Sequence, residues 1–235
     1  MRLQPIIPSI LGVDKESTYF NLPLILKSGV INAIHIDAYS DGIETSYFNS
    51  IANLKELAEI LGAYGAAADI HLLSDLPMDM DEVRRIVNMK LSIPMRISIH
   101  VGKGVALQEF TKICREAGIS PGLAIKLKTP TPLARETVDE FEYMHFICNN
   151  ENDGLNSFQM SVLEKVASFH AIFPEKQVLM DCGIKAEHIE SCIRQGATNL
   201  IMGSAIFKNK EKTPSEIAIE YALKAAAAIS KNTQT

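Results

Sequence analysis

The chain has 235 residues, of which 47% are hydrophobic and 22% charged, and its formal net charge at pH 7 is -5. This composition is typical of a globular chain and argues against a disordered, fibrous or membrane-spanning one. The mild acidity and the lack of a basic run argue against nucleic acid or a membrane surface as partner, so a small ligand is favoured.

The compartment is suggested by the start of the chain and by the cysteines. The opening "MRLQPIIPSIL" lacks the apolar region of a signal peptide, and the four cysteines show no C-x-x-C spacing. We therefore expect reduced thiols, mostly buried, and a cytoplasmic protein.

Short apolar or β-branched runs recur along the chain and predict eight strands, with helical spacing between them. In the first helix Asn21 is expected to be the cap and Pro23 to lie in the first turn, because an interior proline breaks a helix. The predicted strands cover residues 6–11, 33–37, 67–73, 96–101, 122–127, 144–148, 177–181 and 199–203, and the other clear helical stretches cover 46–65, 104–118, 158–173, 185–196 and 213–229.

The alternation of strand and helix predicts a (β/α)₈ barrel. No linker or shift in composition interrupts it, so we expect one domain over residues 1–235, with a short frayed tail from about 230. The competing fold is an open doubly wound sheet. The barrel is favoured because eight strands in one open sheet would be very wide, whereas closure removes both edges.

Polar residues stand where the predicted strands end. The stretch "IHIDAYSDG" from position 34 includes His35 and Asp37, which share one face of a strand because they are two residues apart. His71 closes the third strand and Asp181 the seventh, and the carboxyl ends of barrel strands meet at one mouth. Two imidazoles and two carboxylates suit one divalent ion such as Zn²⁺, Fe²⁺ or Mn²⁺. The alternative is that all four are hydrogen-bonded core residues.

Weaker candidates surround this cluster. Ser9 and His100 end the first and fourth strands and serve either as substrate contacts or as structural hydrogen-bonding groups. Gly183, Gly203 and Ser204 follow the last two strands, where barrels commonly bind phosphate. The alternative for each glycine is that it only serves a turn. We expect Cys182 to be a buried thiol. Three further histidines are expected to be bystanders: His145, His170 and His188.

Six motifs occur in the order found in one family, along nearly the whole chain. They are "PSIL" (8–11), "HID" (35–37), "DIHLL" (69–73), "ISIHV" (97–101), "LMDCGI" (179–184) and "GSAIF" (203–207). With these residues the sequence resembles the ribulose-phosphate 3-epimerase family.

The resemblance implies an isomerase of carbohydrate metabolism that inverts carbon 3 of a ketose phosphate, by default D-ribulose 5-phosphate to D-xylulose 5-phosphate. It implies that Asp37 and Asp181 act as acid and base on opposite faces, through an enediolate that a metal stabilises. It also implies a homo-oligomer. The residues that match the family's metal ligands are His35, Asp37, His71 and Asp181, and those that match its substrate contacts include Ser9, Gly154, Gly183 and Gly203.

The chain departs from the family in the segment 150–156 after the sixth strand, where only Asn150 and Gly154 match. Here we expect Lys126 or Lys128 to pair with an acidic residue, Glu151 or Asp153, or else these charges to be solvated. The family's pocket methionines are replaced by Tyr39 or Ser40, Leu73 and Ile147. Two alternatives follow: an epimerase for another pentulose or hexulose phosphate, or a paralogue that binds a sugar phosphate without turning it over.

Overall fold

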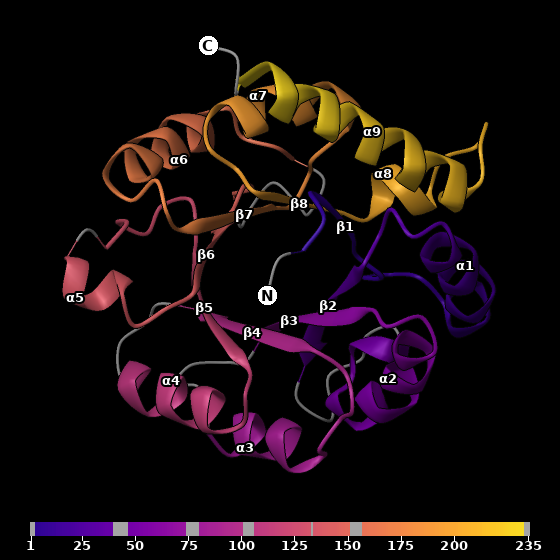
Figure 1. The fold of residues 1–235 in the computed structure, drawn as a ribbon, viewed down its shortest axis with the longest axis horizontal. Helices are drawn as coiled ribbons and strands as arrows, with labels where there is room; N and C mark the ends of the chain where they lie inside the picture. Colours follow the sequence, from indigo (N-terminus) through magenta and orange to yellow (C-terminus); the bar gives the residue numbers. More distant parts are fainter. Residues whose placement is uncertain are drawn as a thin grey trace.

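The structure, a computed structural model, describes residues 3–39, 47–73, 80–100, 106–132, 134–150 and 157–232. Eight parallel strands form a barrel that helices surround on the outside (Figure 1). The strands are β1 (Ile6–Pro8), β2 (Ala33–Tyr39), β3 (Ala67–Leu73), β4 (Met95–His100), β5 (Ser120–Ile125), β6 (Tyr143–Ile147), β7 (Gln177–Asp181) and β8 (Asn199–Met202). The helices are α1 (Lys15–Lys27), α2 (Leu54–Gly62), α3 (Met80–Asn88), α4 (Leu107–Glu116), α5 (Arg135–Val138), α6 (Ser161–Ile172), α7 (Ile189–Arg194), α8 (Ser204–Phe207) and α9 (Pro214–Asn232).

The strands follow one another around the barrel, and the ladder runs β1-β8-β7-β6-β5-β4-β3-β2. Between its two ends, Ser9 bridges to His35, and the backbone N–H of Ile10 donates to the carbonyl oxygen of His35 at 3.3 Å. The sheet therefore nearly closes, which confirms the barrel and not the open sheet. Closure also brings the carboxyl ends of β2 and β7 to the same mouth.

Apolar side chains fill two regions. The larger lies between the strands and the helices, and the smaller lies inside the barrel. Most members of the inner cluster come from the amino-terminal or middle part of a strand, so polar side chains further along face the mouth. The inner cluster consists of Leu3, Ile7, Ala33, Ala67, Tyr143, Leu179 and Ile201.

The expected start of the first helix is wrong. Helix α1 begins at Lys15, and the carboxylate of its N-cap Asp14 accepts from the N–H of Ser17 at 2.7 Å. Pro23 thus lies inside the helix, at a cost of about 3 kcal/mol. The helix persists because Leu22, Ile25 and Leu26 are buried, and each such side chain contributes about 1.5–3 kcal/mol.

At the other end of the chain, α9 continues through Asn232, so the helix includes the first residues of the expected tail. Among the described residues, no helix combines the length and the apolar character needed to span a bilayer.

Candidate active site

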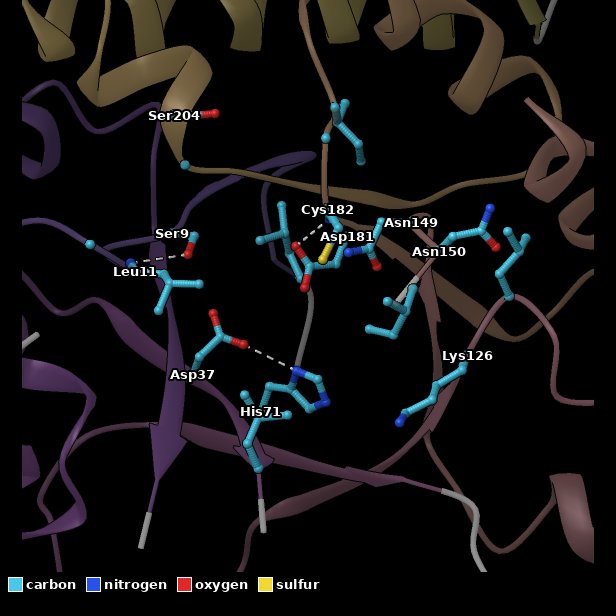
Figure 2. A pocket seen from close by; sticks show the side chains of 18 of the residues that line it. Ser9, Leu11, Asp37, His71, Lys126, Asn149, Asn150, Asp181, Cys182 and Ser204 are labelled. Carbon is cyan, nitrogen blue, oxygen red and sulfur yellow. Dashed lines mark hydrogen bonds and ion pairs between the residues drawn. The ribbon is translucent and has the colours of Figure 1, made fainter. Parts of the chain in front are cut away.

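Strand register brings the four predicted ligands together at the mouth. In β2, His35 and Asp37 point to the same side, and Asp37 stands beside His71 of β3 in the parallel ladder. Asp181 is the last residue of β7. All four are buried, and one ligand atom from each lies within 4.8 Å of every other. Figure 2 shows Asp37, His71 and Asp181 converging from different strands.

The distances within the cluster are short but leave a space between the side chains. Nε2 of His35 lies 3.6 Å from Oδ1 of Asp37 and 3.9 Å from Oδ2 of Asp181. Nδ1 of His71 lies 3.2 Å from Oδ1 of Asp37. Because ligands stand about 2.0–2.2 Å from a metal such as zinc, atoms around one ion are separated by about 3–4.4 Å. The three distances fall within the range expected around one divalent ion.

Burial and neighbouring charges act against each other at these side chains. Burial raises the pKa of Asp37, but the imidazoles of His35 and His71 outweigh it and hold this pKa well below its ordinary value. Burial lowers the pKa of His35, and the carboxylates of Asp37 and Asp69 outweigh it, so this pKa lies well above its ordinary value. The carboxylates around the centre of the cluster thus stabilise positive charge there.

His35 is held from behind by a buried carboxylate that the sequence analysis did not identify as a site residue. Its Nδ1 lies 2.6 Å from Oδ2 of Asp69, and Oδ1 of Asp69 accepts from Nε of Arg96 at 2.6 Å. With Nδ1 engaged, Nε2 of His35 is buried and has no hydrogen-bond partner among the described residues. A metal-ligating histidine commonly has such an outer carboxylate partner. The sequence does offer a signal for this pair, because Asp69 and Arg96 are charged residues that each fall within a predicted strand.

His71 has a similar outer contact. Its Nε2 lies 3.0 Å from Nε2 of His100, while its Nδ1 faces Asp37. Burial, followed by the imidazoles of His71 and His145, lowers the pKa of His100 to about 2, so His100 is neutral and can accept this hydrogen bond. With its proton on Nε2 and donated to His100, His71 would have Nδ1 available as a metal ligand.

These observations test whether the residues fit a metal ion. Each imidazole has one nitrogen engaged from outside and the other directed at the centre, and two carboxylates share that centre. A buried nitrogen without a partner is costly, and an ion at the centre would supply the partner that Nε2 of His35 lacks. The site therefore fits a divalent cation with nitrogen and oxygen ligands.

Asp181 is fixed on its other side by the chain itself. Its Oδ1 accepts from the backbone N–H of the next residue, Cys182, at 2.6 Å. This contact accompanies a left-handed backbone at Cys182, whose φ is 76°. Burial raises the pKa of the Cys182 thiol well above its ordinary value, as in an unreactive thiol. The expectation of a buried residue is wrong, however, because Cys182 is only partly buried and lines the cavity at the mouth.

His145, expected to be a bystander, lies inside the barrel beside the cluster. It is completely buried on β6, and its ring centroid is 4.7 Å from that of His71. Burial lowers the pKa of His145 to about 4, so its imidazole is neutral. The other two histidines with that expectation lie on outer elements, where His170 contacts Gly196 and His188 stacks on Phe158. Side chains alternate along β6, so His145 points into the barrel like Tyr143, two residues earlier. This alternation is the sequence signal that distinguishes His145 from the other two histidines.

A cavity of about 730 Å³ opens above the cluster. A Cβ at Gly203 would stand only 3.2 Å from the carbonyl oxygen of Ser9, and Gly183 has a φ of 70°. Glycine is therefore favoured at both positions by packing or backbone conformation, independently of any phosphate. Gly154 and the acidic residues expected to pair with Lys126 or Lys128 lie outside the described residues. The predicted residues that line the cavity are Ser9, Asp37, His71, His100, Asp181, Gly183, Gly203 and Ser204.

Comparisons with known proteins agree with this geometry. The pattern of the family described as "Ribulose-phosphate 3 epimerase family" matches residues 5–207. The chain is 24% identical over 208 residues to ribulose-phosphate 3-epimerase of Serratia marcescens, covering 86% of this chain and 94% of that protein. It is 23% identical over 207 residues to the enzyme of the same name from Buchnera aphidicola, covering 86% of each.

Solved structures resemble the chain in fold. A mutant tryptophan synthase alpha-subunit from Pyrococcus furiosus superposes with a TM-score of 0.68 at 19% identity, covering 97% of this chain and 100% of that one. At this identity the likeness concerns the barrel alone.

Proposed function

Since the chain belongs to the ribulose-phosphate 3-epimerase family, we propose that it inverts carbon 3 of a ketose phosphate, with D-ribulose 5-phosphate to D-xylulose 5-phosphate as the default reaction. The observation that carries this proposal is the buried set of His35, Asp37, His71 and Asp181 around one centre. These four would hold one divalent ion, and zinc, iron and manganese all suit two nitrogen and two oxygen ligands.

The proton chemistry belongs to the two carboxylates. Inversion requires that one group remove the proton from carbon 3 and that another deliver a proton to the opposite face. Asp37 is supplied by β2 and Asp181 by β7, with β1 and β8 between them in the sheet. They can therefore approach a substrate at the mouth from two directions. When bound, a divalent cation supplies Lewis-acid stabilisation of the negative charge that develops on the substrate oxygens.

Binding of the sugar phosphate is assigned to the residues that line the same cavity. Ser9 and His100 would contact the sugar, while the backbone around Gly183, Gly203 and Ser204 would bind the phosphate. The side chains of Lys126, Lys128 and Lys208 also line the cavity, and their charges favour an anionic ligand. Gly154 is retained as a proposed phosphate contact on the ground of the family resemblance.

A different sugar is the second candidate, and the wall of the cavity favours it. Tyr39, Leu73 and Ile147 line the cavity, and no methionine is among the described residues that line it. Such changes alter which substrate fits while leaving the acid and base in place. If the chain binds a sugar phosphate without turning it over, replacing Asp37 or Asp181 should leave its cellular role unchanged.

We further propose that the protein functions in a reducing compartment such as the cytoplasm, because all four cysteines are free thiols. The homo-oligomer stays a prediction.

The test combines metal analysis with turnover. Purified protein should contain about one equivalent of a divalent metal and should epimerise at least one member of a panel of pentulose and hexulose phosphates. Asp37→Asn and Asp181→Asn should each lower kcat by about 10²–10⁴-fold, the range typical of a lost acid or base. Asp81→Asn, at an exposed aspartate, is the matched control and should retain activity. Protein that binds no metal and turns over none of the panel would refute the proposal.

A further inference from the structure

His145 has a position that neither the metal set nor the two acid-base groups explains. Its Nε2 lies 3.5 Å from Oδ2 of Asp181, and its Nδ1 lies 3.0 Å from Oγ of Ser98. The ring also lies edge-on to that of His35, with centroids 5.6 Å apart. The imidazole of His145 therefore lies next to the carboxylate of Asp181.

The hydrogen-bonding groups assign a direction to this imidazole. Ser98 is buried, and its hydroxyl can donate to Nδ1 of His145, which leaves the ring proton on Nε2. Nε2 is completely buried, has no ordinary hydrogen-bond partner among the described residues, and is directed at Asp181. A buried N–H group costs free energy unless it finds an acceptor, and the carboxylate of Asp181 is the acceptor within reach.

Asp37 and Asp181 differ in the groups that contact their carboxylate oxygens. Oδ1 of Asp37 faces Nδ1 of His71 and Nε2 of His35, and both of these nitrogens are directed at the proposed ion. Asp181 instead has two contacts from outside the ligand set, the N–H of Cys182 at Oδ1 and the imidazole of His145 at Oδ2. The hydrogen bond at Oδ1 and the longer contact at Oδ2 together restrict the rotation of the carboxylate about its Cβ–Cγ bond.

We propose that His145 is a positioning residue for Asp181: held by Ser98, it orients this carboxylate toward the bound ion and the reacting carbon. The inference rests on the proposed function for the identity of the reaction, but not for ion binding. His145 is not one of the four residues whose ligand atoms lie within 4.8 Å of one another, so it acts through Asp181 and not as a ligand. It also lies outside the set of residues that line the cavity, so substrate binding is not its direct role.

The test compares three variants. His145→Leu removes both ring nitrogens, and His145→Gln keeps an N–H donor near the position of Nε2. Ser98→Ala removes the hydroxyl at Nδ1 and leaves His145 in place. The first readout is the affinity for Zn²⁺ or Mn²⁺, measured by competition with a chelator, which requires no turnover. Far-UV circular dichroism and thermal unfolding establish that each variant is folded.

We expect His145→Leu to bind the ion about 10–100-fold more weakly, the range for lost outer-shell partners. His145→Gln should stay within about 3-fold of the parent, because the donor is kept, and Ser98→Ala should fall between the two. If His145→Leu fails to fold, the comparison of His145→Gln with Ser98→Ala decides. Parent-like affinity in both His145→Leu and Ser98→Ala would overturn the proposal, and so would a loss in His145→Gln as large as in His145→Leu.

A second readout separates positioning of Asp181 from a general loss of structure. In D₂O, the deuterium found in recovered substrate relative to product reports which carboxylate exchanges its proton more slowly. His145→Leu should change this ratio and lower kcat with little change in KM, and His145→Gln should restore both. If the parent protein turns over no ketose phosphate, the proposed function fails, while the affinity measurement still decides the role of His145.

Discussion

Cys182 has two roles beside the site: its N–H donates to Asp181, and its backbone adopts a left-handed conformation with φ 76°. A non-glycine residue pays about 1–2 kcal/mol for this conformation. We expect Cys182→Gly to raise the free energy of unfolding by about 0.5–1 kcal/mol, since the greater freedom of glycine in the unfolded chain offsets part of the gain.

Urea unfolding measures this change. Lys90→Gly is the matched control, because Lys90 is the other described non-glycine residue with positive φ, at 50°, and is exposed. Its gain should be similar. A Cys182→Gly protein less stable than the parent would show that packing of the thiol outweighs the backbone strain.

The site was predictable at those residues whose position in a strand carries the signal. Asp37, His71 and Asp181 stand at or within two residues of strand ends, and polar residues there are easily recognised. His35 lies further back in its strand but shares the face of Asp37, two residues away. Asp69 and Arg96 were not recognised because they lie within strands, where a charge is interpretable only once its partner is known. His145 was misjudged for the same reason, since its partner Asp181 is 36 residues away in the sequence (181 − 145).

At the scale of elements, three neighbouring strands carry one buried polar row. Register pairs His35 with Asp69 across β2 and β3, and Asp69 with Arg96 across β3 and β4. Nη1 and Nη2 of Arg96 have no hydrogen-bond partner among the described residues, and its guanidinium lies 4.7 Å from the ring centroid of Tyr143. The positive charge of this row is therefore neutralised chiefly by Asp69.

Removing one charge of this row should be more harmful than removing both. We expect Arg96→Met to lower the free energy of unfolding by about 3–5 kcal/mol, because it leaves the Asp69 carboxylate buried without its cation. The double variant Arg96→Met with Asp69→Asn should recover part of this loss, since an asparagine oxygen can still accept from His35. Chemical denaturation of the single and double variants measures the coupling. Strictly additive losses would mean that the pair is not coupled.

Lys165 holds the loop after β5 through hydrogen bonds to its backbone. The ammonium of Lys165, on α6, donates to the backbone carbonyls of Lys126, Leu127 and Thr129, and all three of these residues line the cavity. Lys165 thereby connects an outer helix to the wall of the site. Its replacement should loosen this part of the cavity wall without altering Asp37 or Asp181.

We expect Lys165→Met to raise KM for the sugar phosphate several-fold, about 3–10-fold, with a smaller change in kcat, as for loss of binding contacts made equally in ground and transition states. Lys176→Met is the matched control. Lys176 also donates to a backbone carbonyl, that of Phe141, but away from the cavity, so its KM should not change. Equal effects of the two substitutions on KM would contradict a specific role for Lys165.

At the scale of the whole molecule, the barrel was predictable because eight strand patterns alternate with helical ones, and each predicted strand overlaps an observed one. The start of α1 was not predictable, because the burial of Leu22, Ile25 and Leu26 overrides the cost of Pro23 only in the folded molecule. The interior of the barrel was also hidden, since its two layers, apolar and polar, arise from closure and not from any one segment.

The buried neutral histidines predict how the whole protein responds to acid. The pKa of His145 is lowered to about 4 and that of His100 to about 2, chiefly by burial, whereas both are near 6.5 in the unfolded chain. Below pH 6.5 the unfolded state binds protons that these folded side chains do not, so stability decreases as pH falls. The raised pKa of His35 has the opposite sign and gives stability that is lost only as pH rises through that value.

We expect chelator-treated protein to lose stability from about pH 6 to pH 4, with each of the two histidines contributing about 1.4 kcal/mol per pH unit well below its unfolded pKa. Urea unfolding at several pH values measures the slope. His145→Gln should reduce this slope by the share of one histidine. A slope unchanged in that variant would contradict a neutral, buried His145.

We propose that Asp37 and Asp181 serve opposite faces of one substrate, and hydrogen exchange at carbon 3 in D₂O, followed by NMR from each epimer separately, tests this most directly. The parent should exchange and interconvert both epimers. Asp37→Asn and Asp181→Asn should each exchange the proton of one epimer without inverting it, and the two variants should act on different epimers. Exchange of the same epimer by both variants, or undiminished inversion in either, would contradict the account.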